Sequence, residues 1–101
     1  MDVRYDVRFF GSVANDQIKE LALEKLEGLS KKFQWIVSAK VNLKDGEGKG
    51  ATRKICEIEL SAPGPRIFAS SQELTYELAI NETIKDLQKQ LVKRKEQFTK
   101  H

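Results

Sequence analysis

Basic side chains gather toward the C-terminal end of this sequence, at spacings that suit the binding of phosphate. Residues 85–101 hold six of them against two acidic residues: Lys85, Lys89, Lys93, Arg94, Lys95 and Lys100. Lysines and arginines on one exposed side of a helix neutralise nucleic-acid phosphates and release their counterions. The alternative is a solvated helix that matches its own macrodipole, because residues 71–84 hold three acidic and no basic residues. Three consecutive bases at 93–95 exceed what the dipole requires and favour phosphate binding.

The sequence offers little for catalysis or metal binding. It has one cysteine, Cys56, and one histidine, His101, whereas a zinc site takes about four such ligands, or about three in catalytic sites. A mechanism with a nucleophile and a histidine would depend on an imidazole at the last residue. The paired carboxylates Glu57 and Glu59 are expected to form a solvated sheet face. We therefore expect a binding protein, not an enzyme, with no cofactor, no metal ion and no small-molecule substrate.

Six elements must position these side chains. The length and a hydrophobic content of 40% suit one domain over residues 1–101. Apolar periodicity predicts four strands and two helices, in the order strand 3–9, helix 15–32, strand 37–44, strand 52–61, strand 66–70 and helix 72–98. The glycines within 46–50 predict a hairpin, since a strand follows them and a phosphate-binding P-loop would be followed by a helix. A right-handed crossover makes the first two strands parallel. The expected fold class is α+β, a β-α-β-β-β-α chain with a four-stranded mixed sheet and two helices on one face.

The two predicted helices differ in the surfaces that they expose. The first is expected to start after an N-cap at Asn15, and its outer side is acidic, with Glu20, Glu24 and Glu27. The second is expected to start with a capping box formed by Ser70 and Glu73. At about 100° per residue, the apolar side of the second helix lies opposite its lysines and comprises Tyr76, Ile80, Ile84, Leu87, Leu91 and Phe98.

Several side chains outside the helices are also assigned to the core. Cys56 is expected to be a buried, unreactive thiol on the inward side of its strand. Val37 is expected to point inward at the start of the second strand. Phe33 and Trp35 are expected to close the core between the first helix and the second strand, although exposed aromatic side chains can also stack on nucleic-acid bases.

The sequence gives no sign of a membrane segment. No apolar run approaches the roughly 20 residues that a membrane-spanning helix requires. The N-terminal residues alternate charged and apolar side chains and lack the apolar stretch of a secretory signal. A cytoplasmic location without a membrane partner is expected.

Motifs along most of the chain are similar to those of a known family. They are Ile18-x-x-Leu21-Ala22-x-x-Lys25-Leu26-x-x-Leu29, Phe33-x-x-Ile36-x-x-Ala39, Ala69-Ser70, Ala79-Ile80 and Leu87-x-Lys89-Gln90-Leu91-x-Lys93-Arg94-Lys95-Glu96. In these motifs the chain resembles the short form of the ribosome hibernation promoting factor family, also called the sigma-54 modulation protein family, which includes the ribosome-associated inhibitor A proteins.

The resemblance implies a fold similar to the double-stranded-RNA-binding domain. It also implies binding to the small ribosomal subunit and its rRNA, in the channel for messenger and transfer RNA, which would stop translation in stationary phase or stress. By resemblance, the rRNA-binding residues are Lys25, Lys89, Lys93, Arg94 and Lys95. The helical wheel alone adds Lys85 and Lys100. Away from the ribosome a monomer is expected.

Two other functions stay open from the sequence. The chain could be a general regulator that binds structured RNA. It could also be a protein-interaction module that seats a partner on apolar sheet residues such as Ile55, without affinity for RNA.

Overall fold

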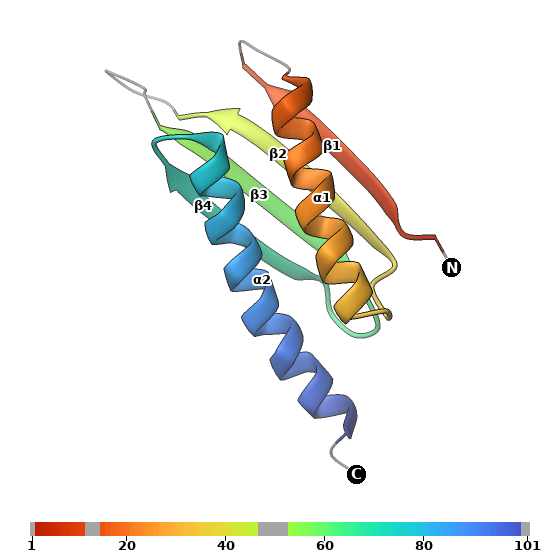
Figure 1. Cartoon of the computed structure of the whole chain (residues 1–101). Helices are drawn as coiled ribbons and strands as arrows, with labels where there is room; N and C mark the ends of the chain where they lie inside the picture. Colours follow the sequence, from red (N-terminus) through yellow and green to blue (C-terminus); the bar gives the residue numbers. More distant parts are fainter. Residues whose placement is uncertain (1, 12–14, 47–52, 100–101) are drawn as a thin grey trace.

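The computed structural model describes residues 2–11, 15–46 and 53–99. Within them the chain forms four strands and two helices in the predicted order (Figure 1): β1 (Arg4–Phe10), α1 (Asp16–Lys32), β2 (Ser38–Asp45), β3 (Lys54–Ser61), β4 (Ile67–Glu73) and α2 (Tyr76–Thr99). The predicted β-α-β-β-β-α order is therefore confirmed.

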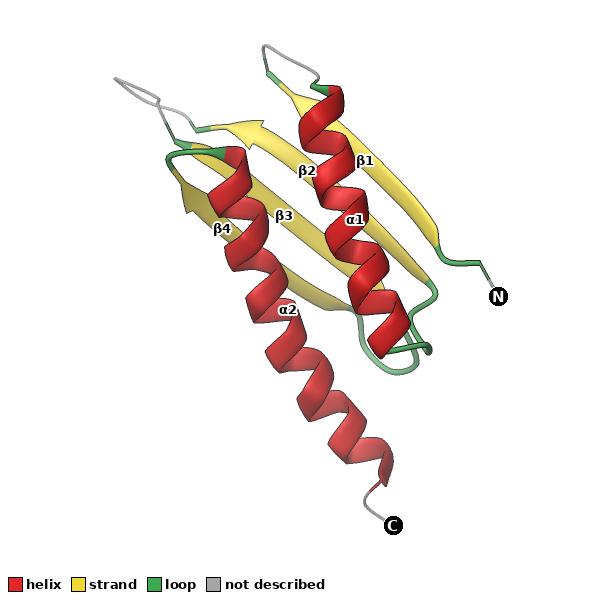
Figure 2. Cartoon of the chain, in the orientation of Figure 1, coloured by secondary structure: helices red, strands yellow, loops and turns green. Residues whose placement is uncertain are grey.

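The four strands form one mixed sheet in the order β1-β2-β3-β4. Strand β1 runs parallel to β2, and the other two neighbouring pairs are antiparallel. Both helices pack on the same face of the sheet, and no described element covers the other face, which we call the uncovered face (Figure 2). The parallel pairing of β1 and β2 is as predicted. The predicted right-handed crossover is wrong, because in Figure 1 both strands run upward behind α1 and β2 lies to the left of β1, which makes the crossover left-handed.

The core lies between the sheet and the two helices. Val41, Leu43 and Ile58 on the central strands are completely buried, and so are Leu87 and Leu91 on α2. The strands alternate between buried and more exposed positions, because successive side chains of a strand point to opposite faces. The core assignment of Leu87, Leu91 and Cys56 is confirmed.

The predicted capping box is wrong. Ser70 and Glu73 lie within β4, where Ser70 pairs with Glu57 and Glu73 pairs with Lys54 of β3. The backbone groups of this segment are used by the sheet, so the helix begins only after the chain has left it. Helix α2 starts at Tyr76, and the hydroxyl of Thr75 accepts a hydrogen bond from the backbone N–H of Leu78 at 3.1 Å. Thr75 is therefore the cap of α2.

Two core assignments near the end of α1 and α2 are also corrected. Val37 precedes β2 in the loop after α1, and its side chain is 53% exposed. Phe98 is 41% exposed, because the last turns of α2 extend past the sheet (Figure 1). Its ring packs edge-on against Trp35, with the ring centroids 5.0 Å apart, and Trp35 in turn contacts Phe33.

The predicted hairpin between the second and third strands lies mostly outside the described residues. Its flanks are described, and the backbone N–H of Gly46 donates a hydrogen bond to the carbonyl oxygen of Arg53 at 2.7 Å. This bond continues the antiparallel pairing of β2 and β3 toward the connection.

Candidate nucleic-acid interface

Three lysines form a continuous line along the exposed side of α2. Lys85, Lys89 and Lys93 are each four residues apart and all are exposed, and we refer to these three as the basic stripe. At about 1.5 Å of rise per residue, the stripe covers about 12 Å of helix. It lines a groove of about 610 Å³, in which Glu96 is the acidic residue. Such a spacing presents three cationic groups to one extended, negatively charged partner.

The direction of the basic stripe is fixed by the opposite side of the same helix. Leu87 and Leu91 are fully buried against the sheet, and the buried Thr83 donates a hydrogen bond to the carbonyl oxygen of Ala79 at 2.7 Å. Because the buried side of α2 cannot turn outward without exposing these side chains, the lysines stay on the solvent side. The predicted opposition of core and basic sides is confirmed for the described lysines.

One lysine of the basic stripe has an acidic neighbour on its own helix. The Nζ atom of Lys85 lies 3.3 Å from a carboxylate oxygen of Glu82, and both side chains are largely exposed. An exposed ion pair of this kind contributes about 0.2–1 kcal/mol or less. The pair therefore holds Lys85 only weakly.

Arg94 holds a turn and does not join the basic stripe. Its two terminal nitrogens donate hydrogen bonds to the carbonyl oxygens of Pro63 at 2.7 Å and Pro65 at 2.9 Å. Between them Gly64 has φ +96°, and a Cβ atom there would lie 2.8 Å from a nitrogen of Arg94. The guanidinium thus closes the loop between β3 and β4 onto α2, and glycine is needed at 64 for both conformation and space.

The other predicted binding residues are dispersed. Lys95 is exposed on α2, but it lies about 160° around the helix from Lys93, two residues earlier. Lys25 is exposed on α1, the helix whose outer side carries the exposed Glu20, Glu24 and Glu27, as predicted. Lys100 lies outside the described residues. The structure therefore brings together three of the six predicted residues that it describes.

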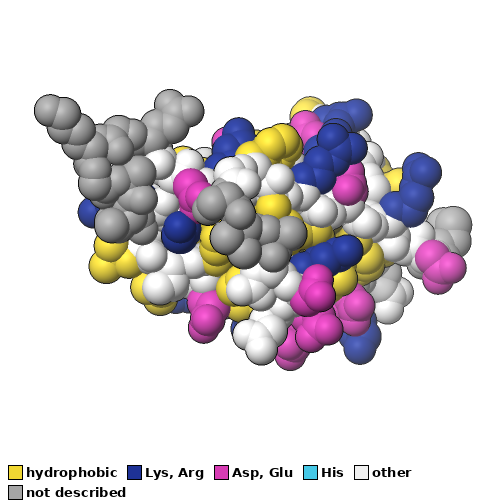
Figure 3. All heavy atoms as spheres, turned by 90° about the horizontal axis from the view of Figure 1, so that it is seen from above, with side chains coloured by type: hydrophobic (Ala, Val, Ile, Leu, Met, Phe, Trp, Pro, Cys, Tyr) yellow, Lys and Arg dark blue, Asp and Glu magenta, His cyan; other side chains and the backbone are white. Residues whose placement is uncertain are grey.

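Acidic and basic side chains are unevenly distributed over the surface. In the end-on view of Figure 3, acidic side chains gather along the lower edge, and lysine and arginine side chains lie more widely along the opposite edge.

A second group of basic side chains lies on the uncovered face of the sheet, and the sequence reasoning missed it. Its members are Arg4 and Arg8 of β1, Lys40 and Lys44 of β2, and Arg66, which directly precedes β4. Their outward positions follow from strand alternation. The sequence pattern does not determine the pairing register, and it is the register that brings side chains from separate strands onto one surface.

The predicted solvated carboxylates also lie on this face, and they are paired. Glu57 binds Lys44 at 2.9 Å, and Glu59 binds Arg66 at 3.2 Å. Asp6 binds its own-strand neighbour Arg8 at 3.0 Å. These contacts explain the carboxylates as partners of basic residues.

Among the described residues, two groups have clearly shifted pKa values: Cys56 in the core and Tyr76 at the start of α2. Burial raises the pKa of the Cys56 thiol to about 11, which keeps it protonated at neutral pH. Burial and a hydrogen bond to Asp45 raise the pKa of Tyr76 to about 12. In the described part of the chain, no three histidine, cysteine or acidic side chains come together to hold a metal ion. No described helix has the length and apolar character needed to cross a membrane.

Comparisons with known proteins agree with this architecture. Two solved structures share the fold: a ribosomal subunit interface protein from Coxiella burnetii, with a TM-score of 0.80 and 20% identity, and the N-terminal domain of Protein Y from Thermus thermophilus, with a TM-score of 0.74 and 22% identity. The alignments cover 91% of this chain and 97% of the first protein, and 90% of this chain and 96% of the second. No functionally curated protein matches the sequence.

The family assignment rests on the sequence itself. The family model for sigma 54 modulation protein / S30EA ribosomal protein matches residues 6–99, which include all six elements except the start of β1. The resemblance inferred from the sequence motifs is confirmed. The chain belongs to the sigma 54 modulation protein / S30EA ribosomal protein family.

Proposed function

We propose that this protein is a ribosome-associated translation inhibitor, which binds the small ribosomal subunit in the channel for messenger and transfer RNA during stationary phase or stress. Family membership supports association with the ribosome. The observation that carries the proposal is the basic stripe, an exposed row of three lysines on a helix fixed by its buried side.

The proposed contact is electrostatic and sequence-independent. Lys85, Lys89 and Lys93 would bind phosphates of rRNA, with further contacts from Lys25, Arg94, Lys95 and Lys100 as the family resemblance and the helical wheel suggest. RNA helices are recognised largely through shape, phosphates and 2′-hydroxyl groups. The molecule is elongated, with extents of 51 × 24 × 18 Å, and α2 extends past the sheet (Figure 1). This shape supports entry of the basic end of α2 into a recess of the subunit.

Inhibition in this proposal requires no chemical step. A protein that occupies the channel competes with messenger and transfer RNA for the same space, and dissociation restores translation. Its site of action is the cytoplasm, where ribosomes work.

The proposal is tested with purified small ribosomal subunits and a variant that carries Lys85→Gln, Lys89→Gln and Lys93→Gln. Glutamine keeps the helix propensity while it removes the charge. We expect unchanged thermal stability, weaker co-sedimentation with the subunits, and a salt dependence that is flatter by about 0.7 to 0.9 per lost phosphate contact.

The matched control changes three charges on the acidic side of α1. Glu20→Gln, Glu24→Gln and Glu27→Gln together should leave binding intact or strengthen it, because repulsion from RNA is removed. Equal affinity for a free RNA duplex and for the subunit would support a general RNA-binding regulator instead. Salt-insensitive association with a protein, without affinity for RNA, would support the interaction module.

A further inference from the structure

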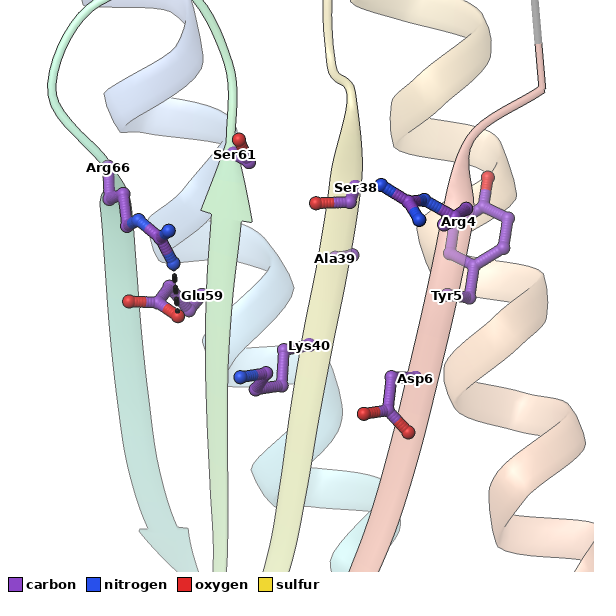
Figure 4. Close-up of a pocket in the computed structure, with 9 residues that line it drawn as sticks. All are labelled: Arg4, Tyr5, Asp6, Ser38, Ala39, Lys40, Glu59, Ser61 and Arg66. Atoms are coloured by element: carbon purple, nitrogen blue, oxygen red, sulfur yellow. Dashed lines mark hydrogen bonds and ion pairs between the residues drawn. The ribbon is translucent and has the colours of Figure 1, made fainter.

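The uncovered face of the sheet is hollowed at one end. A cavity of about 520 Å³ lies over the end of the sheet where β1 and β2 begin and β3 ends (Figure 4). Its polar groups include the guanidinium of Arg4, the ammonium of Lys40, and the hydroxyls of Ser38 and Ser61. The helices lie behind the sheet in this view, so the cavity is separate from the basic stripe on α2.

The pairing register explains why these four side chains meet. Arg4 of β1 pairs with Ser38 of β2, and Ser38 pairs with Ser61 of β3, so three strands contribute to one row. Lys40 lies two residues after Ser38 and therefore on the same face. Neighbouring strands are about 4.8 Å apart, which places two cationic and two hydroxyl groups within reach of a single anion.

Two of the cationic groups at this cavity are unpaired. The nearby carboxylates are engaged elsewhere, since Asp6 binds Arg8 at 3.0 Å and Glu59 binds Arg66 at 3.2 Å. Within the described residues, Arg4 and Lys40 have neither an ion-pair partner nor a side-chain hydrogen bond, and both are exposed. In Figure 4 the guanidinium of Arg4 points toward Ser38, and the side chain of Lys40 points toward β3. Asp6 and Glu59 are the register partners of Lys40 on its two sides. The cavity lining, with three basic side chains (Arg4, Lys40 and Arg66) and two acidic ones (Asp6 and Glu59), therefore keeps a net charge of +1.

We infer that this cavity binds a backbone phosphate of RNA, and that the uncovered face of the sheet is a second RNA-binding surface. Arginine and lysine with hydroxyl donors form the usual set for a phosphate oxygen. An RNA strand fits better than a free anion because the site lies on an exposed sheet face with an aromatic ring nearby. Phe68 of β4 pairs with Glu59 in the same row as Lys40, and it is 53% exposed. Exposed aromatic rings stack on the bases of single-stranded RNA.

This inference rests on the proposed function for the identity of the RNA, which would be rRNA. It adds that RNA contacts the protein from both sides, at the basic stripe of α2 and at the uncovered face of the sheet. A molecule that binds RNA on two opposite surfaces would lie between two RNA elements. Loss of the contact on one surface would then not release it.

The experiment compares a variant with Arg4→Gln and Lys40→Gln against the wild type. Both proteins are titrated onto purified small ribosomal subunits at several salt concentrations. We expect the variant to bind at least about tenfold more weakly, as loss of charge-assisted hydrogen bonds implies. Its salt dependence should be flatter by about 0.7 to 0.9 for one lost phosphate contact. The matched control is Lys19→Gln with Lys31→Gln on α1, which removes two exposed charges and should bind as the wild type does.

A second measurement does not depend on ribosomes or on the folding of a variant. Isotope-labelled wild-type protein is titrated with a short single-stranded RNA, and backbone amide shifts are followed by NMR. The inference predicts concentrated shifts at Arg4, Ser38, Lys40 and Ser61. Shifts confined to α2, or no shifts, would overturn it.

The outcomes separate this inference from the proposed function. If the Arg4 and Lys40 variant binds subunits like the wild type while the basic-stripe variant is impaired, the second surface is wrong and the proposed function stands. If the wild type does not bind subunits but RNA shifts the sheet amides, the proposed function is wrong and the RNA site stands. If the α1 control variant also binds subunits as weakly as the Arg4 and Lys40 variant, the loss of affinity reflects only the lower net charge, and the site is wrong.

Discussion

At the scale of single residues, Arg94 and Lys93 are neighbours in the sequence with different roles. Lys93 is exposed on the basic stripe, whereas Arg94 donates two hydrogen bonds to carbonyl oxygens of the loop between β3 and β4. Adjacent bases in one run therefore have different roles: Lys93 faces solvent, and Arg94 stabilises the fold.

The difference is measurable by urea denaturation. Arg94→Gln should lower the free energy of unfolding by about 1–2 kcal/mol, because two charge-assisted hydrogen bonds are lost at a partly exposed site. Lys93→Gln should change it by no more than about 0.5 kcal/mol, as is usual for surface positions. Equal effects of the two substitutions would show that the clamp on the loop is unimportant for stability.

The raised pKa values of two residues predict that the protein loses stability at alkaline pH. The pKa of Cys56 is raised from 9.0 to about 11, and the pKa of Tyr76 from 10.0 to about 12, in each case chiefly by burial. Because the unfolded chain loses these protons at lower pH than the folded chain, their contribution is complete below about pH 9 and is lost as the pH rises toward 11 to 12. Denaturation curves between pH 8 and pH 11 should show this decline, and Cys56→Ala with Tyr76→Phe should flatten it. A decline of the same steepness in the double variant would assign it to other groups.

At the scale of elements, the packing of α2 on the sheet determines where its charges point. Leu87 and Leu91 are fully buried one turn apart. Leu87→Ala or Leu91→Ala should each lower the free energy of unfolding by about 2–5 kcal/mol, because a cavity replaces the side chain. Thermal melts check this, and a shift of only one or two degrees would contradict the packing. Val92→Ala, on the exposed side of the same helix, is the matched control and should have little effect.

The start of α2 gives a second prediction at this scale. Thr75 caps the helix, whereas Ser70 lies exposed in β4. Thr75→Ala should lower the free energy of unfolding by about 1 kcal/mol, since a helix N–H loses its partner. Ser70→Ala should stay within about 0.5 kcal/mol. Urea denaturation checks both variants. A larger loss of unfolding free energy in Ser70→Ala than in Thr75→Ala would support the capping box that the sequence suggested.

At the scale of the whole molecule, α2 is longer than the sheet that supports it (Figure 1). Its last turns are held by the contact of Phe98 with Trp35, which lies between α1 and β2. Lys93 lies in the turns that this contact orders. The aromatic pair thus connects the packing of one end of the molecule to the geometry of the basic stripe.

Removing the ring tests this connection. Phe98→Ala should accelerate hydrogen exchange of the amides from 93 to 98, since an aromatic pair worth about 0.5–1.5 kcal/mol is lost. The affinity for small ribosomal subunits should fall severalfold, because the end of the stripe must then be ordered on binding. Leu74→Ala, at an exposed residue before α2, is the control. Unchanged exchange in the Phe98 variant would show that α2 needs no support past the sheet.

The sequence alone determined the features that depend on local periodicity. Alternation of apolar residues predicted the four strands, and the 3.6-residue period predicted the two helices and the buried side of α2. The helix between the first two strands predicted their parallel pairing. Asn15 was predicted as the cap of α1, and its side chain accepts hydrogen bonds from the N–H groups of Gln17 and Ile18. These features are predictable because neighbours in the chain cause them.

Only the tertiary structure decided the features that depend on partners far apart in the chain. Pairing with β3 kept Ser70 to Glu73 in the sheet and moved the helix start to Tyr76. The loop at 63–65 engaged Arg94, which the sequence had grouped with its basic neighbours. The register of three strands brought Arg4, Ser38, Lys40 and Ser61 onto one cavity. A one-dimensional pattern states which face a side chain takes, but the distance to residues on other strands is fixed only when the chain folds.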